Sequence, residues 1–286
     1  MIERIAIIGT GLIGASVGLA LREAGFAGDI VGIDTRAAER EAALNSGAID
    51  SATDASDHST VENDDLIILA VPVLAILDWM QKLSPILKPH QLLTDTGSTK
   101  LDISLAAERL FNTADTARFL PGHPMAGKES GGAAMAEADL FRNAMWLFTP
   151  IAPVSPVEEE WRAWVTKFGC RTMELDAARH DQICAWVSHL PQMVSTAMSA
   201  MFADEFAHAP ELAGDFEAIG GRALREMTRL GASPYSMWRD IAFTNTKPIA
   251  ATLFALEQRL AHLRENLKTS ELRDEFEKAN GFRSKR

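Results

Sequence analysis

Cysteine is scarce in this sequence, and its scarcity excludes several classes of protein. The two cysteines, Cys170 and Cys184, are too few for a disulfide framework and occupy no metal-ligand spacing, so no metal site is predicted. Free thiols of this kind are typical of a cytoplasmic protein. Long apolar runs are also missing: the longest, Leu66–Leu77, has twelve residues and contains Pro72, whereas a membrane span needs about twenty. We therefore expect a cytoplasmic protein with no membrane contact.

Positive charge is the second deficit. The chain has 28 basic and 39 acidic residues, a formal net charge of −11 at pH 7, spread along 286 residues. Such a surface repels nucleic acids and anionic lipids, so neither is expected as a partner. A small anionic substrate would therefore need arginines concentrated in one place. The length suits two domains and is ample for a full core.

The most informative stretch runs from Ile5 to Gly14 and reads IAIIGTGLIG. A short β-branched run ends at Gly9, and Ala15–Arg22 has an apolar helical pattern. This order predicts a dinucleotide site: Gly9 allows a sharp turn, Gly11 leaves room for a pyrophosphate, and Gly14 lets the helix approach the sheet. The helix N-terminus offers N–H groups to the phosphates. A signal peptide is the rival interpretation, but the basic leader and the cleavage site it needs are missing.

A second expected strand, Asp29–Ile33, ends at Asp34, twenty residues after the last glycine. A carboxylate there accepts hydrogen bonds from the ribose hydroxyls of NAD and repels the additional phosphate of NADP, so NAD is the expected cofactor. Arg36 lies close enough in sequence to receive that phosphate, which leaves NADP open as an alternative. The predicted cofactor-binding residues are Gly9, Gly11, Leu12, Ile13, Gly14, Asp34, Arg36 and Val71.

Strands and helices alternate along the first part of the chain. This alternation predicts a Rossmann-type, mainly parallel sheet with helices on both faces in residues 1–176. From residue 177 the pattern is helical, so 177–286 is expected to form an all-helical domain for substrate binding and dimerisation. The elements expected after residue 34 are helix 37–46, strand 64–71, helix 73–83, strand 91–95, strand 146–150 and helix 157–168.

Two apolar repeats run through the helical part. The first recurs at spacings of three and four, and comprises Ile183, Val187, Leu190, Val194, Met198 and Met201. The second alternates spacings of four and three as a heptad seam does, and comprises Ile249, Leu253, Leu256, Leu260, Leu263 and Leu267. A seam of this kind has to pack against another apolar surface, so a homodimer through the helical domain is expected.

One loop histidine is a candidate catalytic base. His123 lies between Gly122 and Pro124, after a predicted strand and on the cofactor side of the sheet. An imidazole near its ordinary pKa of ~6.5 is the usual base that takes a hydroxyl proton as hydride leaves the same carbon. A structural histidine that caps a turn is the alternative. Ser98, in the stretch DTGSTK, could orient this histidine or bond the nicotinamide ribose, although a helix N-cap is an equally common use of serine.

The helical part contributes further polar candidates. His189 and Gln192 flank Pro191, which interrupts a helix, and they share one face with Thr196. Such a face lines a cavity or is solvated. His180 with its neighbouring aspartate is interpreted as a helix-start pair rather than as a ligand.

Arginines recur at Arg222, Arg225 and Arg229, a spacing that places them near one another on a helix, and Arg239 follows. In an acidic protein, clustered guanidinium groups suit a carboxylate substrate, which they bind with two hydrogen bonds. A solvated charged face is the alternative.

In combination, these stretches resemble the prephenate/arogenate dehydrogenase family of tyrosine biosynthesis. The matching segments occur in the family's order and are GTGLIGAS (9–16), DTGSTK (95–100), GHPMAG (122–127), ESG (129–131), HD (180–181), SHLP (188–191), TRL (228–230) and MWRDI (237–241). The resemblance implies a homodimeric enzyme that uses NAD for the oxidative decarboxylation of an anionic cyclohexadienol, with prephenate giving 4-hydroxyphenylpyruvate.

The resemblance also implies roles for individual residues. His123 would accept the proton of the ring hydroxyl while hydride passes to the nicotinamide, and Ser98 would hold His123 and the cofactor in register. Arg229 would bind a substrate carboxylate, and His189 would lie near the site. Gln192 stands where many prephenate-using members have a histidine that is expected to face the substrate side chain. Arogenate as substrate, or the use of both substrates, therefore stays open.

A second departure concerns the arginine segment. Gly220 and Gly221 precede Arg222 and do not align with the glycines that the family has just before its arginine, which leaves a contact from a neighbouring subunit open. The chain ends without a regulatory or mutase appendage, so feedback control through one is not expected. Two other classes are weighed: β-hydroxyacid dehydrogenases use a lysine of the helical domain, which the run 177–230 lacks, and an NAD-sensing protein would leave the histidine loop without a purpose.

Overall fold

A computed structural model describes residues 1–54, 61–111, 113, 115–128 and 130–285. Its main sheet has six parallel strands in the order β3-β2-β1-β4-β5-β6, which confirms the Rossmann-type fold. The strands are β1 (Arg4–Ile8), β2 (Asp29–Ile33), β3 (Ser51–Thr53), β4 (Leu66–Leu69), β5 (Leu92–Asp95) and β6 (Arg118–Leu120).

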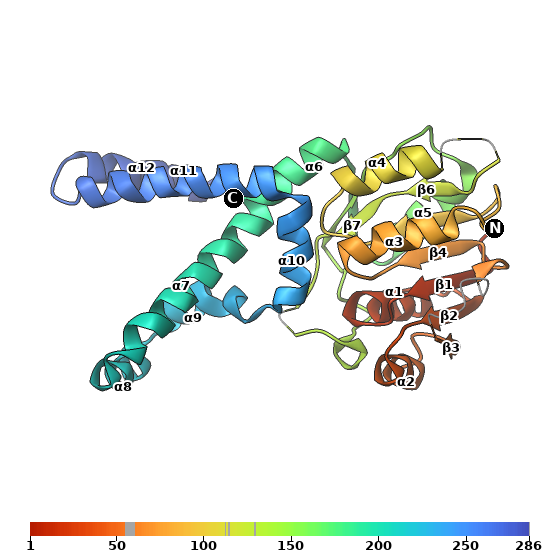
Figure 1. Ribbon diagram of the computed structural model, residues 1–286, viewed down its shortest axis with the longest axis horizontal. Coiled ribbons are helices and arrows are strands. Elements are labelled where there is room, and N and C mark those ends of the chain that lie inside the picture. The colour runs from red at the N-terminus through yellow and green to blue at the C-terminus, as the bar shows by residue number, and fades with distance from the viewer. Residues whose placement is uncertain (55–60, 112, 114, 129, 286) are drawn as a thin grey trace.

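Helices cover both faces of this sheet, as Figure 1 shows. Every residue of β4 is buried, which explains why its sequence is continuously apolar rather than alternating. Two apolar clusters, one on each face, make up the core of the domain. The covering helices are α1 (Leu12–Glu23), α2 (Ala37–Asn45), α3 (Val73–Leu83), α4 (Leu101–Leu110) and α5 (Pro156–Lys167). Helix α1 begins three residues before the expected position, directly after the glycine turn.

A second, three-stranded sheet follows the main one. It consists of β7 (Gly122–Pro124), β8 (Met145–Phe148) and β9 (Arg171–Glu174), with β7 antiparallel and β9 parallel to β8. The segment around His123 is expected to be a loop, but residues 122–124 within it form the short strand β7. A short 3-10 helix (Ala133–Met135) lies between β7 and β8. Trp146 of β8 packs edge-on against Trp161 of α5, and both are fully buried, so this sheet rests on an aromatic core.

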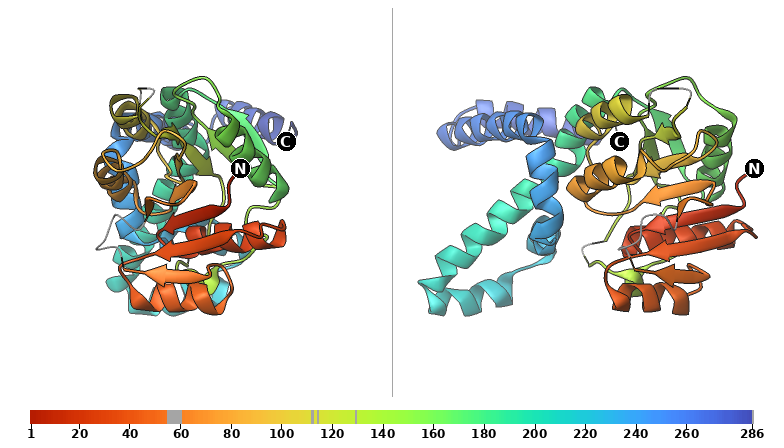
Figure 2. Two further views of the ribbon diagram at one scale, coloured as in Figure 1. Left: turned by 90° about the vertical axis from the view of Figure 1, so that its right-hand side faces the viewer. Right: turned by 45° about the vertical axis from the view of Figure 1, so that its right-hand side comes forward.

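From Ala177 the chain is entirely helical, and two arms extend away from the sheets (Figures 1 and 2). One arm is formed by α7 with α8 and α9, and the other by the hairpin of α11 and α12. Pro191 near the start of α7 follows a π-helical turn (Ala185–His189), which is the interruption that the sequence predicts. The helices are α6 (Ala177–Cys184), α7 (Leu190–Ala207), α8 (Pro210–Ile219), α9 (Arg222–Thr228), α10 (Tyr235–Thr244), α11 (Thr246–Glu265) and α12 (Glu271–Arg283), with a 3-10 turn η4 (Arg229–Ala232).

The two apolar repeats are only partly covered within this chain. Ile249 is buried, but Leu260 and Leu267 of the heptad seam are 55% and 63% exposed. In the first repeat Val187 and Met201 are about half exposed as well. Within the described ranges, none of the helices combines the length and the apolar composition needed to cross a membrane.

Two aspartates of the helical part dock it onto the sheet domain. Asp181 of α6 accepts hydrogen bonds from the backbone N–H groups of Lys100 and Leu101 (2.7 and 2.9 Å), at the start of α4. Asp240 of α10 accepts one from the Leu74 N–H (3.3 Å) at the start of α3. Each carboxylate satisfies N–H groups that lack intrahelical partners and lies at the positive end of a helix dipole.

Candidate active site

The glycine turn has the geometry that a dinucleotide needs. Gly9 has a φ of +93°, and a Cβ there would lie 2.3 Å from the Ala70 carbonyl oxygen. A Cβ at Gly14 would lie 1.9 Å from the Gly9 carbonyl oxygen, so α1 approaches the turn as closely as the sequence predicts. At Gly11 the nearest atom to a Cβ, Arg36 Nη2, is 4.0 Å away. The position that has to admit a pyrophosphate is therefore the open one.

Asp34 follows β2 beside this turn. Its Oδ2 accepts the Thr10 N–H (2.9 Å) and its Oδ1 accepts the Arg36 N–H (2.9 Å), so the carboxylate is held in place. The Arg36 guanidinium pairs with Glu39 at 3.1 Å, which partly neutralises the group that could receive a phosphate. The first turn of α1 contains no acidic residue, so nothing there opposes an anion. These residues fit NAD.

The remaining predicted cofactor residues lie around the same turn. Leu12 is buried and Ile13 is half buried in the first turn of α1. Val71, just after β4, is half buried, and its Cγ1 would be 2.7 Å from a Cβ at Gly9. The carboxyl ends of β1 and β4 thus bring these positions together.

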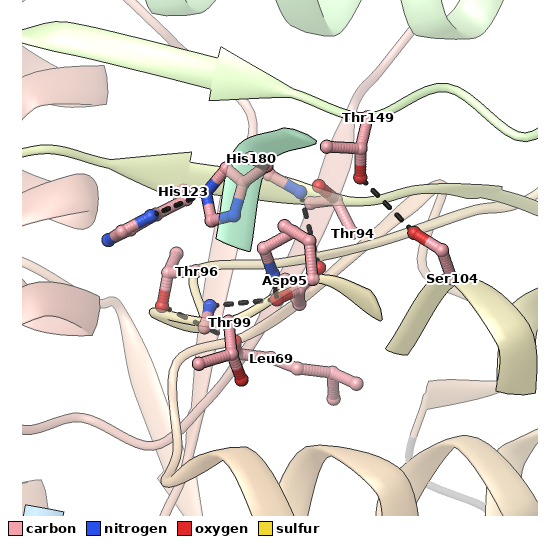
Figure 3. Close-up of polar contacts among 12 residues, drawn as sticks. Leu69, Thr94, Asp95, Thr96, Thr99, Ser104, His123, Thr149 and His180 are labelled. Carbon is pink, nitrogen blue, oxygen red and sulfur yellow. Dashed lines mark hydrogen bonds and ion pairs between the residues drawn. The ribbon is translucent and has the colours of Figure 1, made fainter. Parts of the chain in front are cut away.

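His123 occupies the middle of β7 and is 7% exposed. Its Nδ1 lies 2.9 Å from Nε2 of His180 on α6 (Figure 3). His180 Nδ1 in turn lies 2.8 Å from Asp181 Oδ1. Asp181 Oδ1 is an acceptor here, as it is for the Lys100 N–H, so His180 Nδ1 carries a proton and its Nε2 accepts from His123 Nδ1–H. His123 Nε2 is consequently the nitrogen with a free lone pair, as a general base requires.

The expectation for His180 and Asp181 as a helix-start pair is wrong. The start of α6 is capped by Asp176, whose side chain accepts the Arg179 N–H, and the histidine–aspartate pair lies one turn later. Both side chains are buried and face the sheet domain. The sequence signal for them was the HD segment alone; their partners at Lys100 and His123 are distant in sequence.

Burial sets the charge of these histidines. It lowers the pKa of His123 well below 6.5, and the positive charge of Lys100 acts in the same direction, as would a charge on His180 if that ring were protonated. Burial also lowers the pKa of His180, although Asp181 opposes this. His189 is affected in the same way, with a pKa of about 4. All three are neutral at pH 7, so His123 keeps its lone pair.

A buried ion pair fixes the two loops that meet at this histidine. Lys100 and Asp95 are both fully buried and their side chains are in contact. Asp95 also accepts the N–H groups of Gly97 (2.7 Å) and Gly122 (3.2 Å), which ties the loop after β5 to the start of β7 (Figure 3). Sequence reasoning did not identify this pair. A buried charge with its partner and backbone donors is costly to disturb, because breaking it leaves an uncompensated charge.

Ser98 lies in that loop and is half buried. Among the described residues, the Nδ1 partner of His123 is His180 rather than Ser98. The proposed contact between Ser98 and His123 therefore stays a prediction. Of the resembling segment 129–131, residue 129 lies outside the described residues.

His189 is held at the junction of α6, α7 and α11. The side-chain amide of Asn245 donates to the Asp181 carbonyl oxygen (2.9 Å) and lies 3.0 Å from His189 Nδ1. The carbonyl can only accept, so this amide nitrogen donates to both, and His189 carries its proton on Nε2. Neither His189 Nε2 nor the buried indole nitrogen of Trp238 has a partner among the described residues, and the two rings lie edge to face at 5.8 Å.

The arginines are divided between two consecutive elements rather than carried by one helix. Helix α9 ends at Thr228, so Arg229 belongs to η4 rather than to the helix of Arg222 and Arg225. Arg222 pairs with Glu226 on its own helix, and Arg225 donates to the Gly220 carbonyl. Arg239 pairs with Asp240.

Gln192 is hydrogen-bonded to the backbone of the residue that follows Arg229. The Gln192 amide nitrogen donates to the carbonyl oxygen of Leu230 (2.7 Å), the residue after Arg229. Arg229 itself is exposed, whereas Gln192 is 4% exposed. The segment that carries the arginine therefore packs on α7.

Two family models match the chain. "Prephenate dehydrogenase, nucleotide-binding domain" matches residues 17–165, and "Prephenate dehydrogenase, dimerization domain" matches residues 176–280. The prephenate dehydrogenase of Lactococcus lactis is 31% identical over 264 residues, which cover 92% of this chain and 70% of that protein.

Solved structures show the same likeness. Prephenate dehydrogenase from Aquifex aeolicus, in complex with hydroxyphenyl propionate and NAD+, has a TM-score of 0.83 and 27% identity, and the alignment covers 100% of this chain and 96% of that one. Synechocystis arogenate dehydrogenase has a TM-score of 0.77 and 30% identity, with 99% of both chains covered. With a nucleotide-binding turn, a buried neutral histidine and both family domains in order, this chain belongs to the prephenate dehydrogenase family.

Proposed function

We propose that the protein is an NAD-dependent prephenate dehydrogenase, which oxidatively decarboxylates prephenate to 4-hydroxyphenylpyruvate in tyrosine biosynthesis. Family membership supports the reaction class. The single observation that carries the mechanism is the 2.9 Å contact between His123 Nδ1 and His180 Nε2. We assign Nδ1 as the donor in this contact, which leaves the Nε2 lone pair for a substrate proton.

In this mechanism His123 Nε2 forms a hydrogen bond with the ring hydroxyl and takes its proton. The glycine turn and Asp34 would hold NAD, which would supply the hydride acceptor for the carbon that bears this hydroxyl. The ring carboxylate leaves as CO2, and the electron pair of the broken C–C bond enters the ring, which becomes aromatic. The ring oxygen then takes the proton back from His123, which gives 4-hydroxyphenylpyruvate and restores the neutral imidazole. Proton uptake places a positive charge on a buried imidazole. The hydrogen bonds through His180 to the Asp181 carboxylate spread and stabilise that charge.

The other site residues act by binding and orientation. Ser98 lies in the loop between β5 and α4 and orients the cofactor and His123 when substrate is present. His189 offers a buried Nε2–H donor that has no partner in the described part of the chain, which suits an oxygen of an anionic substrate. Arg229 binds a substrate carboxylate through its guanidinium group. The role of Gln192 is taken up below.

We place the division between the cofactor domain and the helical domain at residue 177, giving 1–176 and 177–286. Two copies associate through the helical domain as a homodimer. The exposed apolar side chains of the two repeats support this assembly, because Val187, Leu260 and Leu267 lack cover in one chain. We assign the enzyme to the cytoplasm, and two buried free thiols at Cys170 and Cys184 are in keeping with a reducing compartment.

Arogenate is the second candidate substrate, alone or together with prephenate. The likeness to Synechocystis arogenate dehydrogenase, at 30% identity over nearly the whole chain, favours keeping it. The two substrates share the ring chemistry and differ in a keto or an amino group on the side chain.

His123→Asn tests the mechanism. The amide keeps much of the volume but cannot take up a proton at neutral pH, so kcat with prephenate should fall roughly hundredfold or more. The affinity for NAD, measured separately by fluorescence titration, should not change. His90→Asn, at an exposed histidine just before β5 and at the opposite end of that strand from Asp95, is the matched control. Turnover that survives in His123→Asn would show that another group is the base.

A further inference from the structure

One face of α7 is a polar stripe that faces η4. Gln192, Ser195 and Ser199 recur at spacings of three and four, so they share this face. The Gln192 amide donates to the Leu230 carbonyl (2.7 Å), and the Gly231 N–H donates to Ser195 Oγ (2.9 Å).

The fit between the stripe and η4 is close. A Cβ at Gly231 would lie 2.5 Å from Ser199 Oγ and 3.3 Å from the Ser195 carbonyl oxygen. Glycine is therefore the residue that allows the turn to reach the helix. With both a backbone carbonyl and a backbone N–H of consecutive residues bonded to α7, the orientation of η4 is defined by two points.

The hydrogen-bonding capacity of Gln192 is used almost completely by this contact. Its two N–H groups donate to Leu230 and to Thr196 Oγ1 (3.1 Å), and its Oε1 accepts from Ser233 Oγ (3.2 Å). The amide cannot be flipped, because the Leu230 carbonyl only accepts. No N–H of Gln192 is left to contact a ligand.

We propose that Gln192 is a positioning residue: it holds η4 so that Arg229, the first residue of that turn, points its guanidinium group at the substrate carboxylate. This rests on the proposed function, in which Arg229 binds that carboxylate. Gln192 then contributes to the binding of any substrate that carries the carboxylate. It does not distinguish the keto side chain of prephenate from the amino side chain of arogenate.

The test compares Gln192→Met with Thr196→Val. Methionine has a similar volume but cannot form the bonds to Leu230 and Ser233, whereas valine at exposed position 196 removes only the bond that does not reach η4. Losing one well-formed hydrogen bond corresponds to about a tenfold change. In Gln192→Met we expect KM for prephenate and for arogenate to rise by the same factor, about tenfold, with kcat changed much less. Thr196→Val should behave as the unmodified protein.

A second measurement is independent of activity. Amide hydrogen exchange in the unliganded protein should become faster across residues 229–233 in Gln192→Met and stay unchanged in Thr196→Val. Ser195→Ala, which removes the bond to Gly231, should give the same pattern and serves if Gln192→Met fails to fold. In the double variant, which combines Gln192→Met with Ser195→Ala, KM should rise by less than the product of the two single increases, because both substitutions act on the same turn.

The outcomes separate the two levels of the proposal. If the unmodified enzyme turns over neither substrate, the proposed function is wrong, and the exchange experiment still decides whether Gln192 holds η4. If Gln192→Met changes the preference between prephenate and arogenate, Gln192 reads the substrate and the positioning role is wrong. If Gln192→Met leaves the amide exchange at residues 229–233 unchanged, or leaves KM unchanged, the positioning role of Gln192 is also wrong.

Discussion

His180 Nε2 lies 2.9 Å from His123 Nδ1, and the two residues belong to different parts of the chain: β7 of the second sheet and α6 of the helical part. Asp181, next to His180, accepts the backbone N–H groups that begin α4. The same residue pair therefore docks the helical part on the sheet domain and determines which nitrogen of His123 is free. A shift of α6 would therefore disturb the tautomer of His123 even if His123 itself did not move.

Replacing His180 should reduce kcat while the affinity for NAD is retained. His180→Phe removes the acceptor for His123 Nδ1–H, so the tautomer with a free Nε2 is no longer favoured, and we expect kcat to fall tenfold or more. His180→Gln should recover part of this loss, since its carbonyl oxygen can accept the same proton. Initial rates with saturating NAD and prephenate give the comparison. If Phe and Gln are equally impaired, His180 acts only by packing.

The pH dependence of kcat/KM should reflect the lowered pKa of His123. A protonated imidazole has no lone pair, so activity falls as pH falls through this pKa. Because burial lowers the pKa below 6.5, the acid limb of the profile should have its midpoint below pH 6.5. A profile of kcat/KM from pH 4.5 to 9 tests this expectation. An acid midpoint above 7 would contradict the buried, neutral base.

Local patterns are enough to predict the cofactor half of the site. Glycines at 9, 11 and 14 act through backbone shape within ten residues, and Asp34 follows from the end of the next strand. The contacts that hold the histidines and the buried ion pair could not be predicted in this way. Its contacts join Lys100 to Asp181 and Asn245 to His189, pairs separated by 81 and 56 positions that carry no common periodicity.

The arginine spacing predicts one continuous helix, and the structure divides it between two elements. Spacings of three and four imply neighbours only while a helix continues, and α9 ends at Thr228, before Arg229. The turn that follows α9 packs on α7, where Gly231 lies against Ser199. That contact is again distant in sequence.

Asp34 should determine the choice of cofactor. Asp34→Ala removes the acceptor for the ribose hydroxyls and the charge that repels an additional phosphate. We expect KM for NAD to rise about tenfold, on the basis of one to two lost hydrogen bonds, and KM for NADP to fall. Glu41→Ala, at an exposed acidic position of α2, is the control for the change in net charge. If the unmodified enzyme prefers NADP, the role of Asp34 is wrong.

His189 should make the fold sensitive to acid. Its pKa is about 4 in the folded protein and ~6.5 when unfolded, so the unfolded state binds the proton first as pH falls. The contribution of neutral His189 to the free energy of unfolding is complete above pH 6.5. It is lost as pH falls from 6.5 to 4, and the total loss is about 3 kcal/mol.

Urea unfolding at several pH values checks this sign. The free energy of unfolding of His189→Gln should depend less steeply on pH between 6.5 and 4 than that of the unmodified protein. His90→Gln, at an exposed position, should retain the original slope. Equal slopes in all three proteins would mean that His189 is already protonated, or accessible to solvent, in the folded state.

The most direct test of the account is NADH formation, followed by absorbance, when purified protein is mixed with NAD and prephenate. The account predicts NADH together with one equivalent of CO2 and of 4-hydroxyphenylpyruvate, and it predicts that His123→Asn loses this activity while still binding NAD. A protein that binds NAD but forms no NADH from either prephenate or arogenate would contradict it.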